Sequence, residues 1–135
     1  SDSYAAEHSI DTLAEIVSTA VAGVAPEIMG IGPVPASLKA LERAGLRLDE
    51  VDVIELNEAF SSQSLAVLKE LALEADDERL NIDGGALAIG HPLGASGARI
   101  LGKAATLLKR TEGEYALAMM CIGGGMGIAT ILRRH

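Results

Sequence analysis

The sequence predicts an α/β fold: a mixed five-stranded sheet with helices on its faces, in the order β-α-β-α-β-α-β-β. Apolar β-branched runs alternate with helical apolar faces along most of the chain. Hydrophobic residues make up 49% and aromatic residues only 2%, so the core must consist of Ala, Val, Ile and Leu, as in tightly packed sheets. Two apolar runs around a glycine turn close the chain and predict a hairpin.

The first elements are the least clearly marked. Residues 1–10 are polar without a sustained period, and we interpret them as a loosely held leading segment before a domain at 11–135. Residues 13–24 are ambiguous, because acidic residues at their start could open a helix, whereas alternating β-branched residues favour a strand. We favour the strand.

The middle of the chain contains a helix and then a strand, loop and helix unit. Pro33 and Gly45 bound a short amphipathic helix, with proline at its start and glycine after its end. A compact apolar strand follows at 51–56 and ends at the tetrapeptide NEAF of residues 57–60. Leucines at 65, 68 and 71 then trace a helical face.

A second strand, loop and helix unit precedes the hairpin. It runs from a predicted strand at 80–82 through the glycine-rich segment 84–97 into a helix with apolar residues from Ile100 to Leu108. The hairpin strands are predicted at 115–121 and 127–132, and the residues that carry chemistry all fall in loops next to strand ends.

Composition excludes several classes of function. The formal charge of −8, from 19 acidic and 11 basic residues, argues against nucleic-acid binding. If the substrate carries phosphates, we expect another part of the protein to hold them. No apolar stretch approaches the ~20 residues that a membrane span needs. A single cysteine excludes an internal disulfide. We expect a cytoplasmic location of the bacterial type, with organellar targeting from an upstream segment as the open alternative.

His91 is the first candidate site residue. It lies in the segment GHPLGASG at 90–97, where small residues permit close backbone approach and Pro92 biases His91 towards an extended conformation. Its imidazole can deprotonate a nucleophile near neutral pH or donate a hydrogen bond to a thioester oxygen. A lone loop histidine more often has a structural role, but the glycines and the adjacent helix start favour function.

Cys121 ends a predicted strand beside a run of three glycines. Backbone N–H groups there, such as that of Gly123, can hold an oxyanion. The alternative for Cys121 is a small buried core residue. A dinucleotide site is a poor explanation of the glycines, because they join two strands, whereas that fingerprint bridges a strand and a helix.

Asn57 occupies the corner between a strand and a helix. It can act as a donor and an acceptor in a site, or it can cap the following helix, and the residues favour both interpretations equally. Glu58 is predicted to have a structural role. No metal site is predicted, because the other histidines, His8 and His135, lie near the termini.

Together these three motifs resemble the thiolase family. They are Asn57-Glu58-Ala59-Phe60, the Gly-His-Pro segment with its following GASG, and Cys121-Ile122-Gly123-Gly124-Gly125. The resemblance covers the chain from about Leu13 onward, and three motifs in order are far more specific than one. It implies a thiolase-like C-terminal domain, one of two similar halves, and it favours the strand at 13–24.

The resemblance also implies roles for the site residues. His91 would activate a nucleophilic cysteine and bind the thioester oxygen, with Asn57 positioning a water at the same oxyanion site. Cys121 would move the proton at the substrate α-carbon, and the Gly123 N–H would belong to a second oxyanion hole. The only cysteine here matches this acid/base thiol, so the nucleophile must come from the N-terminal half.

The implied activity is acyl transfer between CoA thioesters, as in acetyl-CoA acetyltransferases and 3-ketoacyl-CoA thiolases. Met29 and Phe60 align with positions that line the acyl pocket. The expected partners are acyl-CoA, the N-terminal thiolase half on the same or a separate polypeptide, and further copies in a dimer or tetramer. No cofactor beyond the CoA substrates, no nucleic acid and no membrane is expected, and the isolated chain should be inactive.

Two other interpretations compete with a catalytic half. A sterol-carrier-type relative that has lost the second thiol is disfavoured because Cys121 is present. A non-catalytic partner or scaffold domain with the same fold is disfavoured because a scaffold has no physical need for His91, Cys121 and Asn57 together.

Overall fold

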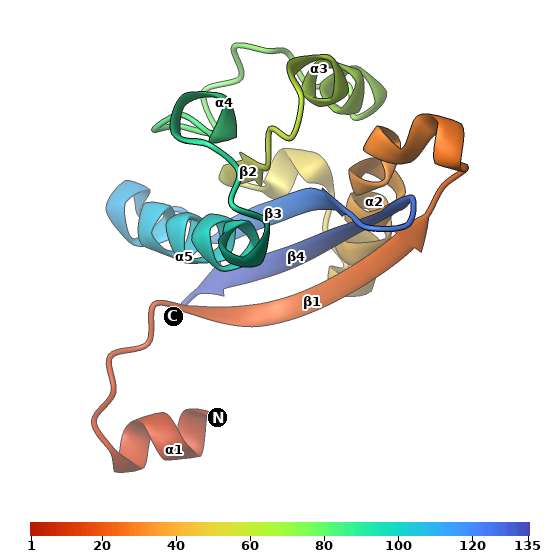
Figure 1. Ribbon diagram of the computed structural model, residues 1–135. Coiled ribbons are helices and arrows are strands. Elements are labelled where there is room, and N and C mark those ends of the chain that lie inside the picture. The colour runs from red at the N-terminus through yellow and green to blue at the C-terminus, as the bar shows by residue number, and fades with distance from the viewer.

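The computed structural model describes residues 1–135 and contains a four-stranded mixed sheet with helices on both faces (Figure 1). The strand order is β1-β4-β3-β2, with β1 at Ala14–Gly23, β2 at Val53–Leu56, β3 at Tyr115–Ile122 and β4 at Met126–Arg134. β4 pairs antiparallel with β1 and with β3, whereas β2 and β3 are parallel. The predicted terminal hairpin is confirmed.

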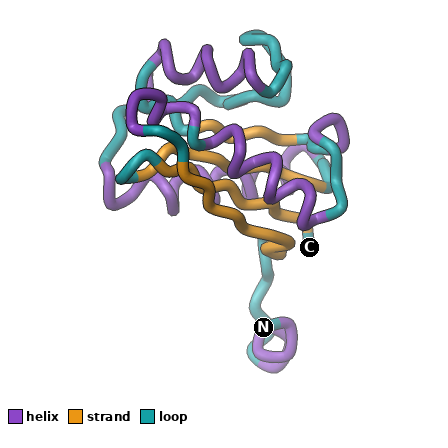
Figure 2. Tube along the Cα trace, turned by 90° about the vertical axis from the view of Figure 1, so that its right-hand side faces the viewer, coloured by secondary structure: helices purple, strands orange, loops and turns teal.

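The helices form a layer on each face of the sheet. α5 covers one face, and α2 and α3 cover the other, which the two views of Figures 1 and 2 show from different sides. None of the helices is both long and apolar enough to cross a bilayer. In chain order the helical segments are α1 (Asp2–Glu7), η1 (Pro26–Ile31), α2 (Pro33–Ala44), η2 (Leu48–Glu50), α3 (Ser61–Glu70), α4 (Ala86–Ile89) and α5 (Leu93–Thr111).

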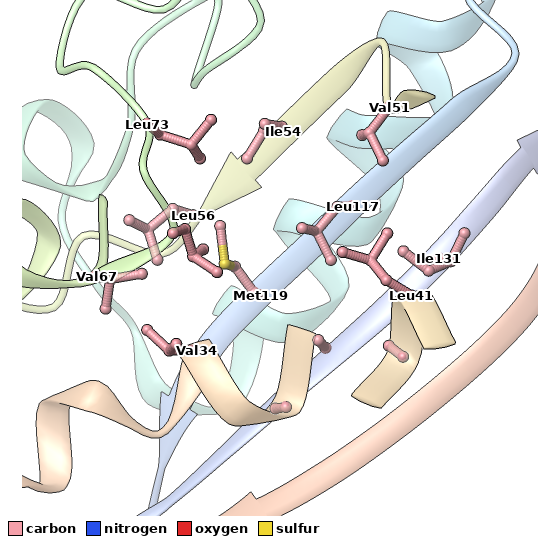
Figure 3. Close-up of a cluster of buried hydrophobic side chains, with 14 of the residues drawn as sticks. Val34, Leu41, Val51, Ile54, Leu56, Val67, Leu73, Leu117, Met119 and Ile131 are labelled. Carbon is pink, nitrogen blue, oxygen red and sulfur yellow. The ribbon is translucent and has the colours of Figure 1, made fainter. Parts of the chain in front are cut away.

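Two hydrophobic cores lie on opposite faces of the sheet. On the α2 and α3 side, Leu117 and Met119 of β3 pack with Leu41 and Val67, as Figure 3 shows. On the α5 side, the intervening β3 residues such as Ala118 pack against that helix. Alternate residues of a strand point to opposite faces, so a central strand with both faces covered must be apolar throughout. This explains the continuous apolar run that predicted β3.

The ambiguous segment at 13–24 is a strand, β1, as predicted. The helix predicted after Pro33 is α2, and Gly45 follows it with a left-handed φ of 69°, which glycine adopts without steric cost. The leading segment differs from the prediction, because residues 2–7 form the helix α1. No residue of α1 is buried, and the helix lies apart from the sheet in Figures 1 and 2.

The predicted fifth strand at 80–82 is wrong. Only Leu80 pairs, in a single bridge to Ile54, and the chain then turns at Asn81 with a φ of 42°. The Asn81 side chain replaces a continuing strand, because its Oδ1 accepts from the Leu56 N–H at 2.9 Å and its Nδ2 donates to the Leu56 carbonyl at 3.0 Å. A side-chain amide that satisfies both backbone groups of Leu56 removes the need for another paired residue.

A close backbone approach joins η1 to the hairpin. Gly32 lies against Gly127, so that a Cβ on Gly127 would overlap the Gly32 backbone. The Val24 N–H also donates to the Gly125 carbonyl at 2.7 Å. These contacts hold η1, which carries Met29, beside the end of β3 and the glycine turn.

Candidate active site

An apolar cavity of about 440 Å³ lies where the loop before α5 meets the glycine turn after β3. Five of the six predicted site residues line it, and the sixth, Asn57, contacts His91 from beneath. The structure therefore brings together residues that are far apart in the sequence. The lining residues are Met29, Gly30, Ala59, Phe60, His91, Leu93, Met120, Cys121, Ile122 and Gly123.

His91 lies in the short loop between α4 and α5. Gly90, with a φ of 90°, ends α4, and Pro92 is the extended N-cap residue of α5, so the loop presents His91 to the cavity. The ring is half-buried, and its Nδ1 lies 2.6 Å from the Oγ of Ser96, which is fully buried in the first turns of α5. A short hydrogen bond to a buried partner fixes the ring orientation.

Asn57 lies directly after β2 and is fully buried. Its backbone N–H donates to the Met119 carbonyl at 2.9 Å, and its side-chain Nδ2 lies 3.4 Å from Nε2 of His91. The capping interpretation of Asn57 is wrong, because the N-cap residue of α3 is Phe60 and no side chain caps that helix. Asn57 instead places its side chain against His91.

Glu58 has the structural role that was predicted for it. Its two carboxylate oxygens accept hydrogen bonds from the Asn81 side chain and from the Leu87 N–H, each at 2.9 Å. A Cβ on Gly85 would overlap this carboxylate. Glu58 thus ties the loop that leads into α4, and through it His91, to the end of β2.

Cys121 lies at the end of β3, opposite Gly127 of β4. It is half-buried on the cavity wall rather than in either core, and burial raises the pKa of its thiol. The thiol is therefore protonated near neutral pH. Gly124 and Gly125 make the turn with φ angles of 73° and 72°, and the N–H of the exposed Gly123 donates to no backbone carbonyl of this turn.

Met29 and Phe60 form the apolar rim of the cavity. Their side chains are exposed by 54% and 60%, so the mouth of the cavity is an open apolar surface. No lysine or arginine lines the cavity. Nor does any group of three or more His, Cys, Asp or Glu side chains gather where it could hold a metal ion.

Arg99 is a site residue that the sequence did not reveal, and Ser96 was recognised only as part of a motif. They lie three residues apart on α5 and so share a helix face. Arg99 donates from Nη2 to the Oδ1 of Asn57 at 3.3 Å. Their spacing after His91 in the sequence indicates that they lie on the face of α5 that is turned towards the histidine. The contact of Arg99 with Asn57, however, follows only from the packing of α5 on the sheet.

Glu55 is a buried acid beneath the site, and it makes stability depend on pH. Burial raises its pKa from the ordinary 4.5 to about 7, although Lys103 and Arg99 lower it in part. The folded state thus holds this proton more tightly than the unfolded state. The stabilisation is complete below about pH 4.5 and is lost as the pH rises through about 7, a fall of roughly 3 kcal/mol.

Glu55→Gln should remove this pH dependence, because glutamine fills the same volume without a charge. Urea unfolding at about pH 5 and about pH 8 should show the variant gaining up to roughly 3 kcal/mol over the unmodified chain at the higher pH only. Glu42→Gln on the exposed face of α2 is the matched control and should change neither value. An identical pH dependence in Glu55→Gln and the unmodified chain would contradict the prediction.

Fold and site together define an α/β domain that presents a histidine, an asparagine and a thiol around one apolar cavity. The chain belongs to the thiolase family: residues 10–134 match the family described as thiolase, C-terminal domain.

Known thiolases resemble this chain along its whole length. It is 54% identical over 134 residues to the 3-oxoadipyl-CoA/3-oxo-5,6-dehydrosuberyl-CoA thiolase of Escherichia coli K12, a match that covers 99% of this chain and 33% of that protein. Human mitochondrial 3-ketoacyl-CoA thiolase matches in structure with a TM-score of 0.95 and 47% identity, over 100% of this chain and 34% of that one.

A second crystal structure of the human enzyme, in complex with CoA, matches with a TM-score of 0.94 and 47% identity, over 99% of this chain and 34% of that one. The chain thus spans about a third of the length of the relatives that it matches. These matches confirm the predicted family and the predicted α/β fold.

Proposed function

We propose that this chain is the C-terminal catalytic half of a thiolase, which transfers acyl groups between CoA thioesters by Claisen condensation or thiolysis. The observation that carries the proposal is the convergence of His91, Asn57 and Cys121 on one apolar cavity. The cavity contains one thiol, whereas an acyl-enzyme mechanism with a separate acid/base thiol needs two.

His91 serves the acylation step in this proposal. Its half-buried imidazole takes the proton of the incoming nucleophilic thiol and then donates a hydrogen bond to the thioester oxygen as negative charge develops there. Asn57 supports the same oxyanion site by positioning a water.

Cys121 serves the carbon–carbon bond step. In condensation the CoA thiolate released by acylation takes the proton of the Cys121 thiol, and the Cys121 thiolate so formed takes a proton from the α-carbon of acetyl-CoA. The resulting carbanion attacks the carbonyl of the acyl-enzyme, which releases the nucleophilic thiolate. In thiolysis the same thiol returns the proton to the departing carbanion. A raised pKa suits this role, because a stronger base removes a weakly acidic carbon-bound proton more readily. The exposed N–H of Gly123 supports the enolate oxygen.

The nucleophilic cysteine and most of the CoA contacts come from the N-terminal half in this proposal. Three facts support this division: the chain has a single cysteine, it spans about a third of its relatives, and its formal charge is −8. A strongly acidic domain repels the phosphates of CoA. The complete enzyme is proposed to be a homo-oligomer.

The cavity favours an apolar acyl chain. The Escherichia coli relative is named for 3-oxoadipyl-CoA, whose acyl chain ends in a carboxylate. Binding a buried carboxylate requires a cation or several donors, and no lysine or arginine lines the cavity formed by this half. Selection for a terminal carboxylate would therefore need a basic group from the other half.

Thiolysis of acetoacetyl-CoA by CoA tests the proposal, with the chain alone and with a recombinant N-terminal thiolase half. Activity is expected only in the mixture, because neither half by itself has both thiols. A chain carrying Cys121→Ala should bind the other half equally well, measured by sedimentation, but should not restore turnover. Turnover by the chain alone would contradict the need for a second half. A stable but inactive mixture with acetoacetyl-CoA and longer 3-ketoacyl-CoA substrates would favour a scaffold role.

A further inference from the structure

A continuous series of polar contacts runs beneath the cavity from α5 to the start of the same helix. Arg99 Nη2 lies 3.3 Å from Oδ1 of Asn57, and Nδ2 of Asn57 lies 3.4 Å from Nε2 of His91. On the far side of the ring, Nδ1 lies 2.6 Å from the Ser96 hydroxyl, which lies 3.2 Å from the Pro92 carbonyl. Asn57 and Ser96 are both fully buried, so solvent does not compete for their hydrogen bonds.

At the Arg99 end of the series, the donor and the acceptor of each hydrogen bond can be assigned in only one way. A guanidinium carries five N–H donors and no acceptor, so the Asn57 atom that faces it must be the carbonyl oxygen. The Asn57 NH₂ group then faces His91 and can only donate. Nε2 of the neutral ring must therefore be the acceptor, without a proton.

The Ser96 end is compatible with this direction. The Ser96 hydroxyl can donate its proton to the Pro92 carbonyl, and its oxygen then accepts from Nδ1 of His91. Because a hydroxyl can also turn to donate to Nδ1, Ser96 adapts to the tautomer, whereas Arg99 and Asn57 select it. The series therefore places the proton on Nδ1 and leaves the lone pair on Nε2.

Arg99 is free to direct this series because it forms no ion pair. Four residues further along α5, Lys103 pairs with Asp83 at 3.0 Å, whereas Arg99 takes part in no salt bridge. Glu55 precedes Asn57 by two residues and faces the same side of the sheet, where it lies near enough to both cations for each to lower its pKa. One Oε of Glu55 and Nε of Arg99 are buried without a hydrogen-bond partner, so neither binds the other directly.

We propose that Arg99 is a positioning residue that orients the Asn57 amide and thereby holds neutral His91 as its Nδ1–H tautomer, with the Nε2 lone pair available to take up a proton. The catalytic meaning of this arrangement rests on the proposed thiolase function. The arrangement itself is a property of the 135-residue chain and can be measured without any activity.

Nitrogen-15 NMR of the histidine rings tests the inference, at a pH where the imidazoles are neutral. His8 and His135 lie outside the site and serve as internal references. The unmodified chain should show a pyrrole-type Nδ1 and a pyridine-type Nε2 for His91. Arg99→Met keeps the aliphatic stem but no donor, so the Asn57 amide can turn and Nε2 should gain pyrrole character. Arg99→Lys, which retains a donor, should keep most of the original pattern.

Asn57→Asp provides a second test, which should shift the ring proton in the same direction. A carboxylate has no N–H to offer His91, so Nε2 should become protonated even with Arg99 in place. The Ser96 hydroxyl would then be free to donate to Nδ1. An unchanged, pyridine-type Nε2 in either folded Arg99→Met or folded Asn57→Asp would overturn the inference, and amide spectra of each variant establish that it is folded.

A kinetic comparison separates this inference from the proposed function. In the reconstituted enzyme, Arg99→Met should lower kcat for acylation by about 10²-fold, the size of effect that misplacing a catalytic group produces, with KM for the thioester nearly unchanged. Arg99→Lys should restore most of the rate. Tautomer changes without thiolase activity in the unmodified complex would overturn the proposed function alone. Full activity of the unmodified complex, together with a His91 tautomer that Arg99→Met does not change, would overturn the role of Arg99 alone.

Discussion

Replacing His91 by alanine in the reconstituted enzyme is expected to lower the rate of acyl-enzyme formation by about 10⁴-fold or more. The imidazole has two tasks in the proposed mechanism, removal of the nucleophile's proton and stabilisation of the oxyanion. Each is typically worth about 10²-fold or more. Trapping of radiolabelled acetyl groups on the enzyme after mixing with acetyl-CoA measures this step directly.

Two variants make the His91 result specific. His91→Gln retains a hydrogen-bond donor but no base, so it should recover part of the oxyanion contribution and remain far below the unmodified enzyme. His8→Ala, outside the site on the exposed leading segment, should leave the rate unchanged. Acyl-enzyme formation at near-normal rate in His91→Ala would show that another group activates the nucleophile.

Replacing Cys121 by serine should have a different consequence, which divides the reaction into its two steps. Acyl transfer from acyl-CoA to the nucleophile involves no proton at carbon, so its rate should stay within a few fold of normal. Condensation should fall by about 10²- to 10⁴-fold, because a hydroxyl is a poor substitute for the thiol as an acid and base. The two rates come from label incorporation and from the appearance of acetoacetyl-CoA.

Met120 offers the matched control for Cys121, because it precedes Cys121 in β3 and also lines the cavity. Met120→Leu conserves volume and should affect both steps modestly and equally. If Cys121→Ser slowed acylation as much as condensation, the assignment of carbon acid chemistry to this thiol would be refuted.

The sequence predicts the principal residues of the candidate site better than it predicts their hydrogen-bond partners, because the partners are brought together by tertiary packing. The sequence predicted His91 and Cys121 because the glycine and proline around them shape local loops. Glu58 was predicted to have a structural role, and its contacts agree. For Asn57 the sequence left a helix cap and a site residue equally open, and only the structure shows that its side chain reaches the histidine. Arg99 was missed because its partner lies 42 residues away.

The fold shows the same division between local and long-range information. Hydrophobic periodicity predicted the strands at β1, β2, β3 and β4, as well as α2, α3 and α5. It failed at residues 80–82, where a few apolar residues suggested a strand but the Asn81 side chain satisfies the backbone of Leu56 instead. It also missed α1, whose polar residues form a helix that buries none of them.

The sequence by itself determined the α/β class and the positions of the four strands along the chain, and it singled out the histidine and the thiol as candidate site residues. These features depend on periodicity and on glycine or proline at particular turns, which are properties of neighbouring residues. Only the tertiary structure decided the strand count and the contact between Arg99 and Asn57, on which the proposed proton position of His91 rests. Hydrogen bonds between β2 and α5 depend on how a helix packs on a sheet, because a side chain's partner is set by its position in space.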